Sequence, residues 1–136
     1  MNKDVGRNAE RELVSILRNA GYNSVRIPTS NSSGNPLPDV FAVRGSVLLS
    51  IEVKSTWERK VKVRSIQLDK ILRFVSMFPL EGHALIAVKF KSLRQWRYFE
   101  VFSPSDVVVD TENTRPLEEL LGQVILQGSE ISTVVS

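Results

Sequence analysis

Two acidic residues and a lysine are spaced so that they could act together on one substrate. Asp39 precedes a run of β-forming residues, and Glu52 and Lys54 lie close together in the stretch "SIEVKS". Side chains alternate between the two faces of a strand, so Glu52 and Lys54 are predicted to share one face and Ile51 and Val53 the other. A carboxylate beside an ammonium has two interpretations: a solvated salt bridge, or a site that binds a metal ion and a phosphate.

A predicted β-hairpin brings Asp39 close to Glu52. The segment "DVFAVRGSVLLSIEVKS" contains two β-rich runs around a tight turn at residues 44–46. With the turn centred on Gly45, Asp39 faces Ile51 or Glu52, at a Cβ separation of about 4.5–5.5 Å. Two carboxylates this close repel each other unless a proton or a cation lies between them. The spacing therefore favours a hard divalent ion such as Mg²⁺, with Mn²⁺ as the alternative.

A predicted N-terminal helix supplies a third carboxylate. Apolar residues recur at three- and four-residue spacing from Val5 to Ala20, which is typical of a helix with one buried face. With Leu13 at the centre of that face, Glu10 lies roughly 60° away, on its border. A partly buried carboxylate needs a partner. We expect Glu10 to join the acidic cluster; the alternative is a surface residue paired with Arg7.

A basic segment follows the acidic pair. Residues 54–64, "KSTWERKVKVR", hold five basic residues and one acid, and we interpret them as a basic loop that contacts a polyanion. A solvated loop is an equally good explanation of the charge alone. Trp57 in this segment is predicted to pack against the protein, with stacking on a base or sugar as the alternative. Glu58-Arg59-Lys60 repeats the Glu-x-Lys spacing, but no strand and no partner carboxylate precede it.

The composition excludes several kinds of site. The 136 residues contain no cysteine, which removes disulfides, thiolate catalysis and cysteine zinc sites, and the only histidine, His83, cannot form a histidine metal cluster. The length is that of one domain, predicted to span residues 1–136. The sequence has no long apolar run and no signal peptide. We therefore expect a soluble, cytoplasmic protein without a membrane partner.

The remaining patterns complete an α/β domain. They predict an extended piece "SVRIPT", a loop "SNSSGNPLP", a second helix from about Ser65 to Phe78, a strand pair "HALIAVKF" and "QWRYFEVF", and a short helix over residues 116–121. The order α-β-β-β-α-β-β predicts a central mixed five-stranded sheet with flanking helices. The apolar residues Phe74, Met77 and Phe78 exceed what one helix face buries; they either make a dimer contact or complete the core.

The motifs also match a known family. Pro38-Asp39 followed by Glu52-Val53-Lys54 resembles the PD-(D/E)xK signature of the restriction-endonuclease-like nucleases, whose αβββαβ core agrees with the predicted order. Over roughly residues 3–90, the stretches "GRNAEREL", "SNSSGNPLPDVFA" and "IEVKST" resemble the archaeal Holliday junction resolvases, and the Hje type more than the Hjc type. The resemblance implies a homodimer that resolves four-way DNA junctions in recombination and repair, by metal-dependent hydrolysis of opposing strands.

The resemblance further implies roles for single residues. The implied catalytic set is Glu10, Ser30, Asp39, Glu52 and Lys54. Its three acidic members are the implied metal ligands, and Ser30, for which Ser32 or Ser33 are alternatives, is expected near the scissile phosphate. The basic residues expected to contact the DNA backbone are Arg7, Arg26, Lys60, Lys62 and Arg64.

Two other functions fit the same sequence. One is a different PD-(D/E)xK nuclease, of the restriction or repair type, which would cut linear duplexes or flaps as well as junctions. The other is a DNA-binding module without catalysis, in which the acidic cluster is structural. Protein partners such as a sliding clamp are compatible with the sequence, but no motif indicates them.

Overall fold

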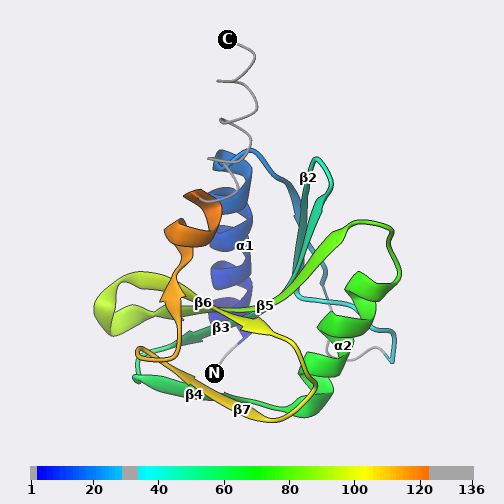
Figure 1. The fold of residues 1–136 in the computed structure, drawn as a ribbon. Helices are drawn as coiled ribbons and strands as arrows, with labels where there is room; N and C mark the ends of the chain where they lie inside the picture. The colour runs from blue at the N-terminus through cyan, green and yellow to red at the C-terminus, as the bar shows by residue number, and fades with distance from the viewer. Residues whose placement is uncertain (1–2, 29–33, 123–136) are drawn as a thin grey trace.

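The computed structural model describes residues 3–28 and 34–122 as two sheets and their flanking helices (Figure 1). The elements in chain order are α1 (Lys3–Asn19), β1 (Asn23–Arg26), β2 (Val40–Arg44), β3 (Val47–Thr56), β4 (Lys60–Val63), α2 (Ser65–Ser76), β5 (Glu81–Phe90), the 3-10 helix η2 (Lys91–Leu93), β6 (Gln95–Val101), β7 (Val107–Asp110) and β8 (Arg115–Pro116). Residues 117–122 are helical. No helix in these ranges is both long enough and apolar enough to cross a membrane.

The main sheet is mixed, as predicted. Its strand order is β1-β2-β3-β5-β6-β8. Strands β3 and β5 are parallel and are connected through α2, whereas the other neighbours pair antiparallel. The sheet has six strands rather than the predicted five. The additional strand, β8, is two residues long, which is too short to produce an alternating pattern in the sequence.

A second, two-stranded sheet pairs β4 with β7. The expectation of a loop between the hairpin and the second helix is therefore wrong for Lys60–Val63. Along β4 the two lysines are exposed, whereas Val63 is buried and Val61 is partly buried. This alternation is that of a strand with one solvated face. The high charge of the exposed face obscured it in the sequence.

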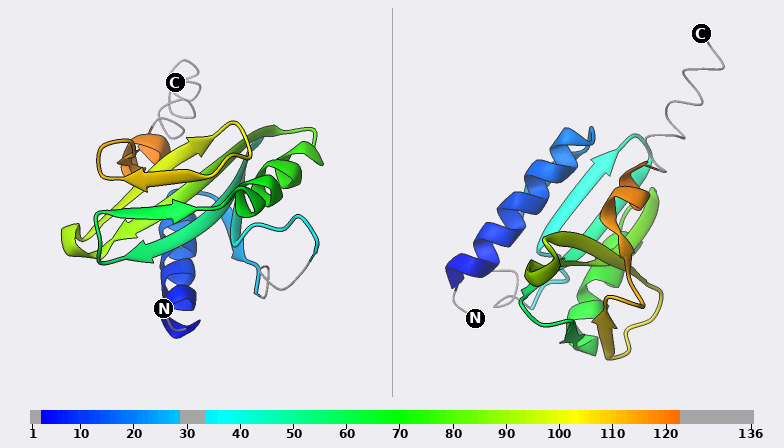
Figure 2. Two further views of the ribbon diagram at one scale, coloured as in Figure 1. Left: turned by 90° about the horizontal axis from the view of Figure 1, so that it is seen from below. Right: turned by 90° about the vertical axis from the view of Figure 1, so that its left-hand side faces the viewer.

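The two long helices cover opposite faces of the main sheet (Figures 1 and 2). Helix α1 packs through Leu13 and Leu17 on the face that carries Leu85, and α2 packs through Leu68 and Ile71 on the face that carries Ile86. A strand covered on both faces needs apolar residues on both, which explains the run "ALIAV" in β5. A Cβ on Gly82 would lie 2.8 Å from Val75 Cβ, so only glycine permits this close approach of α2 to β5.

The β2–β3 hairpin forms as predicted. Its turn is Gly45-Ser46, and the positive φ of Gly45, 57°, is one that glycine adopts without strain. Val40 pairs with Ile51, and the Asp39 N–H donates to the Ile51 carbonyl oxygen at 3.1 Å. Continued by one residue, this register puts Asp39 opposite Glu52. The predicted juxtaposition of the two acidic residues is thereby confirmed.

Candidate active site

Asp39 is held by contacts to the strands on both of its sides. Its carbonyl oxygen accepts a hydrogen bond from the Ile27 N–H at 2.8 Å, and its own N–H donates to Ile51. Its carboxylate Oδ2 accepts the backbone N–H of Val53 at 2.9 Å. The residue is only 4% exposed. The carboxylate is therefore fixed beside β3, next to Glu52.

Glu52 lies on the face of β3 that α2 covers. Its Oε2 accepts a hydrogen bond from Gln67 Nε2 at 3.0 Å and lies 3.5 Å from Lys54 Nζ. Burial, followed by the negative charge of Asp39, raises the pKa of Glu52 from 4.5 to about 8, although Lys54 acts in the opposite direction. Without a cation, Glu52 thus retains a proton at neutral pH.

Glu10 approaches this pair from α1. Burial and, secondarily, the charge of Asp39 raise the pKa of Glu10, while Arg26 opposes the shift. Glu10 Oε1 accepts a hydrogen bond from Arg26 Nε at 2.8 Å. The partner is therefore Arg26 rather than Arg7, which is exposed. Over residues 3–28 and 34–122, no three acidic, histidine or cysteine side chains are grouped closely enough to hold one metal ion. A third ligand from Glu10 stays a prediction.

Ser30 and its alternatives Ser32 and Ser33 lie outside the described residues, so their predicted role stays a prediction. The structure does describe the predicted basic residues of β4 and the residue that follows it. Lys60 and Lys62 are exposed on the same face of the strand, and Arg64 is the residue that precedes α2.

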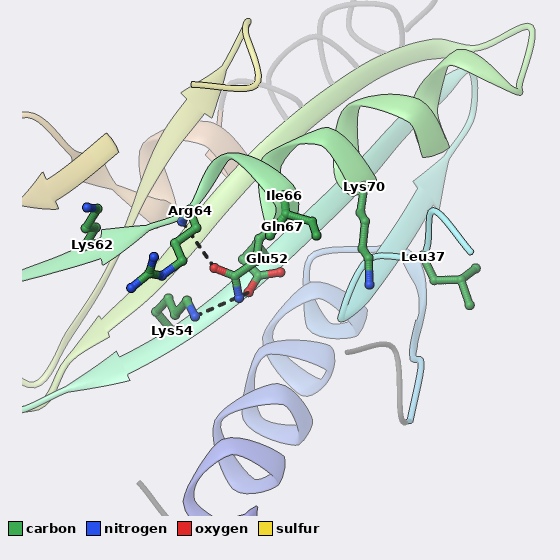
Figure 3. A pocket seen from close by; sticks show the side chains of 8 residues that line it. All are labelled: Leu37, Glu52, Lys54, Lys62, Arg64, Ile66, Gln67 and Lys70. Atoms are coloured by element: carbon green, nitrogen blue, oxygen red, sulfur yellow. Dashed lines mark hydrogen bonds and ion pairs between the residues drawn. The ribbon is translucent and has the colours of Figure 1, made fainter. Parts of the chain in front are cut away.

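A pocket of about 410 Å³ opens between β3, β4 and the N-terminal half of α2 (Figure 3). Among the described residues that line it, Glu52 is the only acidic one, whereas Lys54, Lys62, Arg64 and Lys70 supply four cations. Asp39 and Glu10 do not line it. A concave, cationic surface beside a buried carboxylate pair suits a phosphate of a polyanion and the metal ion that neutralises it.

The sequence analysis missed two residues of this pocket, Gln67 and Lys70. The Gln67 amide is oriented at both ends, because its Oε1 accepts the Arg64 N–H at 3.4 Å and its Nε2 donates to Glu52. Glutamine at this helix position is a signal for N-terminal capping. That signal does not predict a hydrogen bond to Glu52, which lies 15 positions away on a strand. Lys70 lies one turn further along α2 and extends towards Leu37 (Figure 3).

Comparison with known proteins gives consistent matches. Residues 1–129 match the family model described as "Archaeal holliday junction resolvase (hjc)". The crossover junction endodeoxyribonuclease Hje of Saccharolobus solfataricus is 58% identical over 120 residues, which cover 88% of this chain and 89% of that protein. The Hje of Sulfolobus acidocaldarius is 57% identical over 90% of this chain and 88% of its own. The Hjc of Archaeoglobus fulgidus is 28% identical over 96% and 90%.

The fold is also that of a solved structure. The 1.6 Å structure of Archaeoglobus fulgidus Hjc, a Holliday junction resolvase, superposes with a TM-score of 0.72, covering 85% of this chain and 98% of that chain at 24% identity. The α/β class is thereby confirmed, and the higher identity to the Hje proteins agrees with the predicted type. The chain belongs to the archaeal Holliday junction resolvase family.

Proposed function

We propose that this chain is a metal-dependent endonuclease that resolves four-way DNA junctions, with Asp39 and Glu52 as its metal ligands and residues 1–136 as one nuclease domain. Its membership of the resolvase family and the names of its relatives, crossover junction endodeoxyribonucleases, support the activity. The observation that carries the site assignment is the buried Asp39–Glu52 pair, which lies beside Lys54 at a cationic pocket.

The acidic pair fits a divalent cation. Mg²⁺ is typically held by one or two carboxylates together with water and substrate phosphates. Burial and the negative charge of Asp39 raise the pKa of Glu52 to about 8, so Glu52 keeps its proton at neutral pH. A bound cation would neutralise the pair in place of that proton. We assign Mg²⁺, with Mn²⁺ as the alternative. Such an ion would supply an activated water and would stabilise charge on the scissile phosphate.

The other residues position the substrate and the ligands. The Lys54 side chain is 23% exposed, so its ammonium can neutralise a phosphate or orient the attacking water. Gln67 fixes the Glu52 carboxylate, and Glu10 completes the acidic cluster next to Asp39. Ser30 is assigned to the scissile phosphate.

Basic side chains around these groups would hold the DNA backbone. They set affinity and register without reading sequence, because the phosphates are the same at every step. The residues assigned to this role are Arg7, Arg26, Lys60, Lys62 and Arg64.

A homodimer would place two such sites on one junction. An apolar surface supports it: Val25, Met77 and Phe78 are 43%, 56% and 40% exposed. The surface is continuous, because Val25 pairs with Phe41, and the rings of Phe41 and Phe78 both pack on the buried Phe74, at centroid distances of 5.4 and 5.1 Å. Phe74 thus completes the core, whereas Met77 and Phe78 are available to a second copy. Two-fold symmetry would then set the separation of the two sites.

Replacing Asp39→Asn keeps the side-chain shape but removes one charged ligand. We expect cleavage of a four-way junction in Mg²⁺ to fall by roughly 100-fold or more, with junction affinity nearly unchanged. The measurement is a gel assay on matched four-way, flap, linear and single-stranded DNA, with and without Mg²⁺. Asp69→Asn, at a half-exposed position of α2 where the side chain pairs with Arg73, is the matched control. Full activity of the Asp39 variant would refute the metal assignment, and equal cutting of linear duplex by the wild type would refute junction selectivity.

The raised pKa of Glu52 predicts a pH dependence of the metal-free protein. Because the folded pKa, about 8, lies above the ordinary value of 4.5, the folded state binds the extra proton. The contribution of this proton to the free energy of unfolding is complete below about pH 4.5 and is lost as the pH rises towards 8. Urea unfolding in EDTA should show this loss, and the Glu52→Gln variant should show less of it. Added Mg²⁺ should stabilise the wild type most at the upper end of the range. Parallel pH profiles for the two proteins would contradict the assignment.

Removing the Gln67 amide should loosen the Glu52 carboxylate. We expect Gln67→Ala to lower cleavage about 10–100-fold at limiting Mg²⁺, with partial recovery at high Mg²⁺ and unchanged junction affinity. Gln67→Glu, which can still accept the Arg64 N–H but opposes Glu52 with a second charge, should lose more. Gln95→Ala, at the start of β6, serves as the control. A purely structural role would instead lower the unfolding temperature and leave the Mg²⁺ requirement unchanged.

The dimer contact can be tested by placing a charge on the apolar surface. Because Phe78 is only partly buried, Phe78→Asp should fold, yet it should separate the two copies by burying an unpaired carboxylate at their interface. Light scattering after size exclusion should give twice the chain mass for the wild type and the single mass for the variant. Val108→Asp, at a 45% exposed valine of β7, should remain dimeric. A monomeric wild type at micromolar concentration would exclude the proposed dimer.

A further inference from the structure

Trp57 lies in the turn between β3 and β4, and it does not pack as the sequence pattern predicted. The residue is 70% exposed, an unusual position for the largest apolar side chain. Lys91 of η2 lies over the ring, with its Nζ 5.7 Å from the ring centroid. We propose that Trp57 stacks on a DNA base exposed at the branch point of the four-way junction, and so helps the enzyme to distinguish junctions from continuous duplex.

The position of Trp57 along β3 fits this role. The strand that carries Glu52 and Lys54 ends at Thr56, and Trp57 follows directly. Trp57 lies three positions after Lys54, which corresponds to about 10 Å along an extended strand. Successive base pairs in duplex DNA are about 3.4 Å apart. A base on Trp57 would therefore lie about three base pairs from a phosphate held at Lys54.

Cations connect the pocket to this turn. Lys62, which lines the pocket, and Lys60 are exposed on the same face of β4, about 6.6 Å apart along the strand. Beyond them, Arg59 is exposed in the turn itself.

Nearby acidic groups do not cancel this charge. Glu58 is exposed beside Trp57, Asp110 pairs with Lys60 in the β4–β7 ladder, and Asp106 lies 3.7 Å from Lys62. Lys91 adds its charge at the Trp57 ring, so cations predominate along the path from the pocket to Trp57. This path suits a phosphate backbone that would bring its bases to the ring.

An exposed indole is best suited to bind a base at a point where the stacking of the DNA is interrupted. Inside a continuous duplex, both faces of each base are covered by its neighbours, and freeing one costs unstacking energy. Where four arms meet, the stacking of neighbouring pairs can be interrupted, which leaves a base face available to an aromatic ring. Lys91 occupies one face of the Trp57 ring, so the base would take the other. Base–aromatic stacking is tolerant of sequence, which matches selection by DNA shape.

This inference rests on the junction-cleaving function and adds a determinant of its selectivity. Its test uses Asp39→Asn as a background, so that DNA is bound but not cut. In that background, Trp57→Ala should lower the affinity for a four-way junction about tenfold while changing the affinity for a linear duplex of the same arms less than about twofold. Trp57→Phe should restore part of the loss. The control is Phe102→Ala. Phe102 is 83% exposed and follows the end of β6 that is remote from η2, so this substitution should change neither affinity.

Fluorescence reports the contact directly. The chain has two tryptophans, and the other, Trp96, is 9% exposed and donates its Nε1–H to Glu12 at 2.9 Å. Quenching of tryptophan emission by the junction should therefore disappear in Trp57→Phe. A 2-aminopurine at the branch point, but not one within an arm, should be quenched by the protein with Trp57 and not by Trp57→Ala.

The outcomes separate this inference from the function on which it rests. Equal loss of affinity for junction and duplex in Trp57→Ala, or no loss for either, would overturn the stacking role. So would quenching at the arm and the branch point alike. If the protein with Trp57 intact failed to prefer the junction over the duplex at all, the proposed function itself would be wrong.

Discussion

The register of β2 against β3 is the constraint on which the site depends. A slip of one residue would turn every side chain of β3 to the opposite face and would aim Glu52 at α1, away from Gln67 and the pocket. The slip is prevented by packing, because Ile51 and Val53 belong to the core under α1 and would be replaced there by Glu52 and Lys54. The hydrophobic core thus determines the position of the carboxylate pair. The short turn at Gly45 fixes the register of the hairpin, because it determines which residues of β2 and β3 pair.

Placing two carboxylates here opposes folding unless each has partners. Asp39 receives the Val53 N–H, and Glu52 receives the Gln67 amide and approaches Lys54. These contacts do not neutralise the pair, as the raised pKa of Glu52 indicates. In the proposed function, this residual charge is what would attract a cation, whereas a fully satisfied network would have little affinity for one. A site suited to metal binding is therefore also one that the folded protein tolerates at some expense of stability.

Much of the main sheet could be predicted, because its signals are local. Alternation and the glycine turn located the hairpin, and helical periodicity located α1 and α2. The errors share a different cause. Strand β4 pairs with β7, more than 40 residues along the chain, and neither strand alone carries a clear pattern. The contacts of Gln67 with Glu52 and of Arg26 with Glu10 depend on how a helix crosses the sheet, which one sequence does not reveal. The exposure of Trp57 likewise depends on how far a turn projects beyond the core.

The small sheet of β4 and β7, which the sequence did not predict, contributes differently to the site from the main sheet. The β2–β3 hairpin of the main sheet positions Asp39 and Glu52, whereas β4 carries the cations Lys60 and Lys62. The segment before β7 fixes the start of α2, because Asp106 Oδ1 accepts the Ser65 N–H at 2.7 Å, a bond that lowers the pKa of Asp106. A carboxylate there also suits the positive end of the helix dipole. By anchoring this end of α2, the small sheet orients Gln67 towards Glu52 and places its own lysines beside the pocket. In the proposed function, the positions of the metal ligands and of the phosphate-binding lysines would thus be set by two sheets that meet at the N-terminus of α2.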